Sequence, residues 1–123
     1  MKTVLLADDN PFILETLAAR LRNGGRQVLT ATNGQEAVDS GKGSHLDLAI
    51  LDVSMPVMNG LEAAERLHEM LPRLPIILFT SYADAMQSHP EQAGVIAVFD
   101  KSSRLYDLFK LVDACLWEKE NAG

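Results

Sequence analysis

Residues 3–14 read TVLLADDNPFIL and contain one change of pattern. Thr3 to Ala7 is a short β-rich run, and the apolar residues that follow Pro11 have helical spacing. Asn10 suits the cap of that helix because its side chain accepts bonds from the first free amides, and Pro11 suits the first helical position. The stretch predicts a strand that leads directly into a helix.

The same alternation recurs to the end of the chain. Further strands are expected at residues 27–31, 46–51, 74–79 and 95–99. Helices are expected from Pro11 to Gly24-Gly25, over 35–40 closed by Gly41 and Gly43, from the cap Asn59 to Pro72, and over 104–117. Apolar strands that alternate with helices indicate a parallel sheet covered on both faces. The expected fold class is therefore α/β, a doubly wound five-stranded parallel sheet flanked by five helices.

The fourth of these helices has the weakest pattern. Ala83, Ala85 and Met86 favour a helix within residues 83–93, but Pro90 lacks an amide donor and should break or restart it. We expect a short or irregular element there.

Length and charge restrict the class of protein. A chain of 123 residues has the size of one compact domain, so residues 1–123 are expected to form a single domain with no attached output domain. The net charge of −6 and the lack of a basic run argue against nucleic-acid binding. The N-terminal apolar run is too short for a membrane span or a secretory signal, so we expect a cytoplasmic protein.

Cysteine and histidine provide no metal site of their own. Cys115 is the single cysteine, which excludes an intrachain disulfide and a multi-thiolate metal site, and we interpret it as a core residue. His45, His68 and His89 lack ligand spacing and are expected to have structural or surface roles.

Polar residues follow four of the expected strands. Asp8 and Asp9, Asp52, Thr80, and Lys101 stand at strand ends, and the carboxyl ends of parallel strands form the usual ligand-binding edge. Three carboxylates close together require a cation, and oxygen ligands select a hard ion such as Mg²⁺. An aspartate beside such an ion is suited to attack a phosphoryl group, with lysine and threonine contacting the phosphoryl oxygens. Each Asp taken singly is equally consistent with a strand-ending turn.

The motifs together resemble response-regulator receiver domains. They are LLADD at 5–9, LDVSMP at 51–56 with Gly60, LFTS at 78–81 and FDK at 99–101. Thr80 and Lys101 lie 28 and 49 residues after Asp52, and ordered spacing across four motifs is more specific than any single motif. The resemblance covers essentially the whole chain.

The resemblance implies a fold and a set of roles. It implies the flavodoxin-like strand order 2-1-3-4-5. It implies that Asp52 is the phosphoacceptor, that Asp9 binds Mg²⁺ directly, and that Asp8 binds it through water. The backbone carbonyl of Ser54 would complete the protein ligands. The implied donor is a histidine kinase or a histidine phosphotransfer protein, the output partner is unknown, and the domain is a phosphoacceptor, not an enzyme.

By the same resemblance, the output response depends on movement near the site. Thr80 moves toward the phosphoryl group and Lys101 pairs with it, which reshapes the face built from the fourth helix, the fifth strand and the fifth helix. Ser54 and Tyr82 occupy the positions that tune the lifetime of the phosphoryl group.

Three positions depart from the family pattern. Val98 stands where receivers carry a switching aromatic residue, and Phe99 should face the opposite side of the strand as a core residue. Ser102 follows the lysine where proline is common, and Pro90 interrupts the fourth helix. These departures put the coupling of Thr80 to the output surface in doubt.

Two other functions remain open. A phosphatase of the haloacid-dehalogenase kind uses similar groups, but its signature is Asp-x-Asp followed by Thr, whereas Asp8 and Asp9 are adjacent and precede Asn10 and Pro11. A receiver-like module that binds its partner without phosphorylation is compatible with Val98 and Pro90.

Overall fold

The protein contains one five-stranded parallel sheet. The structure is a computed structural model that describes residues 1–81 and 90–121, for 118–121 the backbone alone. Within these residues the strand order is β2-β1-β3-β4-β5, and every neighbouring pair is parallel. The strands are β1 (Thr3–Ala7), β2 (Gln27–Ala31), β3 (Leu48–Leu51), β4 (Ile76–Thr80) and β5 (Val95–Asp100). The expected fold class and strand order are confirmed.

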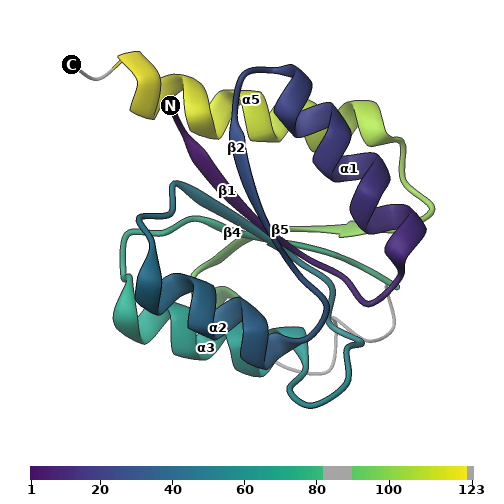
Figure 1. The fold of residues 1–123 in the computed structure, drawn as a ribbon, viewed down its shortest axis with the longest axis vertical. Helices are drawn as coiled ribbons and strands as arrows, with labels where there is room; N and C mark the ends of the chain where they lie inside the picture. Colours follow the sequence, from purple (N-terminus) through teal and green to yellow (C-terminus); the bar gives the residue numbers. More distant parts are fainter. Residues whose placement is uncertain (82–89, 122–123) are drawn as a thin grey trace.

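Helices cover both faces of this sheet, as Figure 1 shows: α2 and α3 lie on one face, and α1 and α5 lie on the other. Their bounds are α1 (Pro11–Asn23), α2 (Gly34–Gly43), α3 (Gly60–Met70) and α5 (Leu105–Asn121). A 3₁₀ turn, η1 (Pro90–Ala93), precedes β5.

Where the sequence predicts five helices, the described residues contain four α-helices and one 3₁₀ turn. Pro90 begins the turn, whereas Ala83, Ala85 and Met86 lie outside the described residues.

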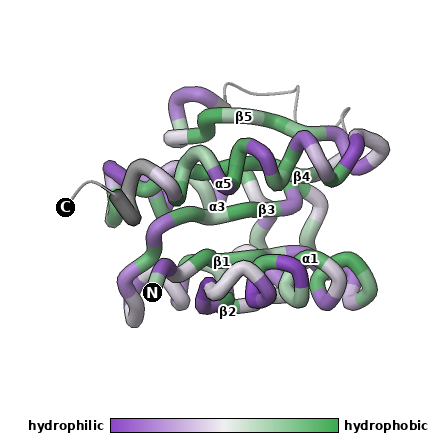
Figure 2. The backbone as a smooth tube through the Cα atoms, turned by 90° about the horizontal axis from the view of Figure 1, so that it is seen from above, coloured by the Kyte–Doolittle hydropathy of each residue, from purple (hydrophilic) through white to green (hydrophobic). Residues whose placement is uncertain are grey.

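Alternate residues of each central strand enter two separate cores. Leu5 and Leu51 pack toward α2 and α3, whereas Leu6 and Ile50 pack toward α1 and α5. Figure 2 shows the resulting apolar character along β1 and β3. Both faces of these strands are buried, which explains their continuous apolar sequences.

Asparagine side chains begin three of the helices, and the sequence predicts those at Asn10 and Asn59. Asn10 accepts the amides of Phe12 and Ile13 at the start of α1. Asn33 accepts the amide of Glu36 in α2, and the Glu36 carboxylate accepts the Thr32 amide in return. The remaining cap is Asn59, which accepts the Glu62 amide in α3. These caps place the helix starts beside the carboxyl ends of the strands.

Several predicted boundaries differ from the structure. Helix α2 continues through Gly41, because that glycine lies against Leu67 of α3, where an added Cβ would be 2.5 Å from the leucine side chain. Strand β4 begins after Pro75, which has no amide to donate. Strand β5 extends one residue further than expected, and α5 runs to Asn121.

A buried carboxylate shortens the start of β3. Asp47 accepts the Thr3 amide on its side chain at 2.9 Å, so β3 starts at Leu48 and not at Leu46. Burial raises the pKa of Asp47, but the bonds from Thr3 and His45 outweigh burial and hold the pKa below its ordinary value. The carboxylate therefore stabilises the end of the sheet opposite the strand-end aspartates.

Candidate functional site

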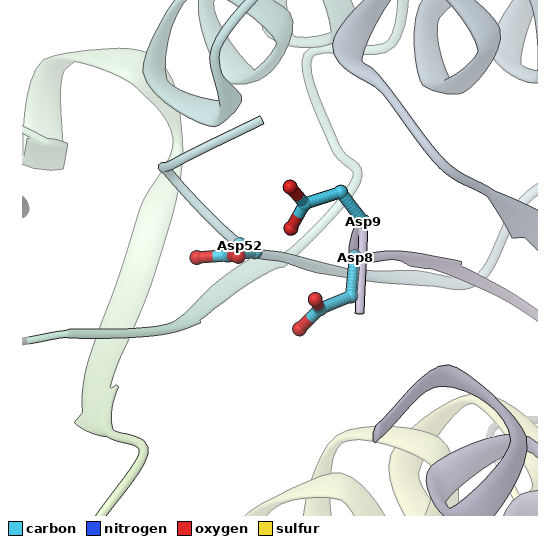
Figure 3. Close-up of side chains that lie close together, drawn as sticks. All are labelled: Asp8, Asp9 and Asp52. Carbon is cyan, nitrogen blue, oxygen red and sulfur yellow. The ribbon is translucent and has the colours of Figure 1, made fainter. Parts of the chain in front are cut away.

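Three carboxylates meet at the carboxyl ends of β1 and β3. Asp8 and Asp9 follow β1, Asp52 follows β3, and the two strands are neighbours in the sheet. One carboxylate oxygen from each residue lies within 4.8 Å of the others, and Figure 3 shows the three side chains. Asp8 and Asp52 are only 2% and 3% exposed, whereas Asp9 is exposed. The site is open to solvent on the side of Asp9.

Lys101 neutralises part of this negative charge. Its Nζ lies 3.0 Å from Asp8 Oδ2 and 3.1 Å from Asp52 Oδ2. Burial would lower the pKa of Lys101, but its hydrogen bonds to the two aspartates outweigh burial and raise that pKa. Burial and the nearby Asp52 raise the pKa of Asp8, against the lowering effect of the Asn10 amide and Lys101. Lys101 therefore carries a positive charge in direct contact with the two buried aspartates.

Thr80 holds the other oxygen of Asp52. The buried hydroxyl of Thr80, at the end of β4, donates to Asp52 Oδ1 at 2.7 Å and accepts the Val53 amide at 3.3 Å. The Ser54 amide also donates to Asp52 Oδ1, at 3.3 Å. Both oxygens of Asp52 thus have fixed positions.

The cluster has the donor set of a magnesium site. Carboxylate oxygens are the ligands that Mg²⁺ prefers, and a site with one exposed member leaves room for the waters this ion retains. Asp8, Asp9 and Asp52 form the one cluster of this kind within residues 1–81 and 90–121. The structure brings Ser54 to the site through its amide, and the ligand role of its carbonyl stays a prediction.

Two glycines allow the loop after Asp52 to pack closely. An added Cβ at Gly60 would lie 2.0 Å from the Asp52 carbonyl oxygen, and one at Gly34 would lie 2.2 Å from the Met58 carbonyl oxygen. The Gly34 amide donates to that same Met58 oxygen at 2.9 Å. The backbone around Asp52 is therefore fixed from α2 and α3. Gly60 belongs to one of the motifs recognisable in the sequence, whereas no local pattern indicates the close approach of Gly34 to the Met58 carbonyl.

Two of the three residues that depart from the family pattern, Val98 and Ser102, lie on β5 and just after it, and the third, Pro90, begins η1. Val98 is half-buried against the α2 and α3 core, and Phe99 is half-buried against the α1 and α5 core, so the expectation that the two face opposite sides is confirmed. Ser102 donates to the Asp100 carboxylate. The position of Tyr82 lies outside the described residues.

Cys115, His45 and His68 lie away from the cluster of Asp8, Asp9 and Asp52. Cys115 is half-buried against the α1 and α5 core, which agrees with its interpretation as a packing residue. His45 contacts Asp47, and His68 is half-buried on α3. His89 lies outside the described residues. No helix in the described part of the chain has the length and apolar character needed to cross a membrane.

Comparison with known proteins identifies similar domains. The family model of the response regulator receiver domain matches residues 4–113. The autoinducer 1 sensor kinase/phosphatase LuxN of Vibrio campbellii is 41% identical over 75 residues, which cover 61% of this chain and 9% of that protein. The chain spans between 9% and 43% of the length of such curated relatives.

Solved structures with the same fold contain magnesium. The response regulator TrrA of Thermotoga maritima, in complex with Mg²⁺-BeF, has a TM-score of 0.84 and 33% identity, with 94% of this chain and 99% of that chain covered. The receiver domain of a Pseudomonas aeruginosa sensor histidine kinase has a magnesium ion in its active-site cleft. Its TM-score is 0.80 at 27% identity, with 92% of this chain and 95% of that chain covered.

Proposed function

This chain belongs to the response regulator receiver domain family, and on that premise we propose that Asp52 is the residue that accepts the phosphoryl group. A receiver domain is a phosphoacceptor signalling domain of a two-component system, and its chemistry depends on Mg²⁺. The observation that carries the assignment of Asp52 is its central position. It is the one aspartate of the cluster that contacts both Thr80 and Lys101.

The proposed reaction transfers a phosphoryl group from a histidine nitrogen to a carboxylate oxygen. A bond forms between Asp52 and phosphorus, the P–N bond breaks, and the imidazole nitrogen keeps the electron pair and takes up a proton. Bound Mg²⁺ would be held by Asp8, Asp9, Asp52 and the Ser54 carbonyl, and it supplies positive charge to the phosphoryl oxygens.

Lys101 and Thr80 have the complementary task in this proposal. Lys101 moves its ammonium group from the free carboxylates to a phosphoryl oxygen, and the Thr80 hydroxyl donates to another. Both groups already lie within 3.1 Å of Asp52, so only short movements are needed. The fold has therefore already placed the Lys101 ammonium group and the Thr80 hydroxyl close to where negative charge develops on the phosphoryl oxygens during transfer.

The partners follow from the chemistry of the donor. We propose a histidine kinase or a histidine phosphotransfer protein as the donor and a separate protein or domain as the output partner. Kinases that form phosphohistidine use cytoplasmic ATP, so the proposal places this domain in the cytoplasm. Residues 1–123 would act as one receiver unit, with no nucleic-acid contact of its own.

A module that binds its partner without phosphorylation is the second candidate. Val98 favours it, because a half-buried valine cannot swing as an aromatic ring does when Thr80 moves. In that case partner binding would be the same for wild type and for Asp52→Asn.

Intact mass after incubation with acetyl phosphate tests the proposal. We expect one phosphoryl adduct on the wild type with Mg²⁺ and no adduct in EDTA or on Asp52→Asn. Asp47→Asn is the matched control, because Asp47 is also a buried carboxylate but lies at the other end of β3, and this variant should be labelled like the wild type. An adduct on Asp52→Asn equal to that of the wild type would reject Asp52 as the acceptor.

A further inference from the structure

The loop after Asp52 contains a strained turn at Val57. This residue has a φ of +71°, and among the described residues it is the one non-glycine residue with positive φ. The Met58 amide donates to the Pro56 carbonyl at 2.8 Å, so Val57 is the central residue of a γ-turn of the rare, strained form. A β-branched residue is among the least suited to this region of backbone space.

The backbone of this turn is held by contacts that do not involve the valine side chain. The Met58 carbonyl accepts the Gly34 amide, and the Gly60 amide donates to the Val53 carbonyl at 2.9 Å. Met55 and Met58 are buried on either side of the turn. Glycine or asparagine at position 57 would adopt the same φ with less strain.

The valine side chain makes no evident contribution to the isolated domain. It is 81% exposed, so it buries little apolar surface that would offset the strain. Strained residues persist mainly where a functional contact needs them. We propose that Val57 is a docking contact for the phosphohistidine donor protein and that it packs against an apolar side chain beside the donor's histidine. This inference rests on the proposed function.

The buried position of Asp52 indicates that the phosphohistidine donor protein, and not another partner, contacts the surface around Val57. Asp52 is almost completely buried, and a transferring phosphorus must come within about 3 to 3.5 Å of its oxygen. The surface around the donor's histidine must therefore rest on the loops that surround Asp52. Val57 lies on the loop that leaves Asp52, and the 77% exposed Phe12 lies in the first turn of α1, just after Asp9. These two exposed apolar residues follow neighbouring strands, one in a loop and one in the first turn of a helix, and they fit an apolar partner surface.

Rates of phosphoryl transfer from a small-molecule donor and from a protein donor distinguish an effect on protein docking from an effect on the transfer reaction itself. Phosphoramidate contains the P–N bond of phosphohistidine but no protein surface, and the second donor is the phosphorylated cytoplasmic part of a histidine kinase that labels the wild type. The variants are Val57→Ile, Val57→Thr and Val57→Asn. Isoleucine keeps strain and apolar surface, threonine keeps the strain alone, and asparagine relieves the strain and removes the apolar surface.

We expect all three variants to react with phosphoramidate and Mg²⁺ at the wild-type rate. With the kinase donor, kcat/KM should fall about 5- to 10-fold for Val57→Thr and Val57→Asn, the size expected for one lost apolar contact, and stay within about twofold for Val57→Ile. The Tm of Val57→Asn should rise by about 3 to 5 °C, because the turn is no longer strained.

Other results would overturn the inference in distinct ways. Unchanged kinase transfer for Val57→Thr and Val57→Asn would show that the donor does not contact this side chain. Equal losses with both donors would show that Val57 positions the loop around Asp52 and is not a docking contact. A wild type that takes up no phosphoryl group from phosphoramidate or from any phosphorylated histidine kinase would reject the proposed function itself.

Discussion

Replacing Lys101 with methionine should destabilise the metal-free protein by leaving two buried carboxylates without a cation. The ammonium group contacts both Asp8 and Asp52 at close to 3 Å, and its side chain is 24% exposed. At an effective dielectric constant of about 20, one such contact has a gross energy of about 5 kcal/mol, most of which desolvation offsets. Breaking a fully buried pair costs about 3 to 5 kcal/mol, and partial exposure of the lysine reduces this to about 2 kcal/mol.

Thermal and urea unfolding followed by circular dichroism measure this effect. In EDTA, Lys101→Met should lower the Tm by about 6 to 10 °C, whereas Lys110→Met, which removes an exposed lysine of α5, should change it little. Millimolar Mg²⁺ should raise the Tm of Lys101→Met more than that of the wild type, because the ion replaces the missing positive charge. Equal stability of the two proteins in EDTA, or an equal response to Mg²⁺, would refute the reasoning.

Three further predictions concern single side chains. The pKa of Asp47 is lowered by folding, so its contribution is present above the unfolded pKa near 4 and disappears as the pH falls through the folded pKa. Asp47→Asn should therefore lose about 1 to 2 kcal/mol in urea unfolding at pH 7, and a difference that persists undiminished at pH 2 would contradict this. Gly60→Ala should destabilise the fold by more than about 2 kcal/mol and abolish labelling by acetyl phosphate, because the new methyl group meets the Asp52 carbonyl. Its control, Gly43→Ala, has open space around the new methyl group and should be labelled normally. Thr80→Val should lose about 1.5 to 3 kcal/mol in EDTA and slow the labelling, since the hydroxyl bonds a charged carboxylate; wild-type values in both assays would count against its role.

The arrangement of strands and helices was predictable because local patterns agree with the tertiary packing. Continuous apolar stretches indicate the central strands, and asparagine caps mark the starts of α1, α2 and α3. The strand-end residues Asp8, Asp52, Thr80 and Lys101 do converge. Their meeting follows from the general rule that parallel strands end at one edge. The strand order came from the family resemblance, not from the residues.

Features that depend on long-range contacts were not predictable. Helix α2 passes through Gly41 because α3 packs against it, and β3 starts late because Asp47 bonds Thr3. The turn at Val57 contradicts local preference, since a β-branched residue disfavours positive φ. The backbone at such positions is fixed by contacts with residues distant in the sequence, and a local sequence pattern contains no information about those contacts.

The most direct test of the central claim is to locate the phosphoryl group on the chain. Borohydride reduces an aspartyl phosphate to homoserine, so the labelled wild type can be reduced, digested and sequenced by tandem mass spectrometry. We predict homoserine at position 52 alone, dependent on Mg²⁺ during labelling, with Asp8 and Asp9 unchanged. Homoserine at position 8 or 9, or at no position after successful labelling, would contradict the assignment of Asp52 as the phosphoacceptor.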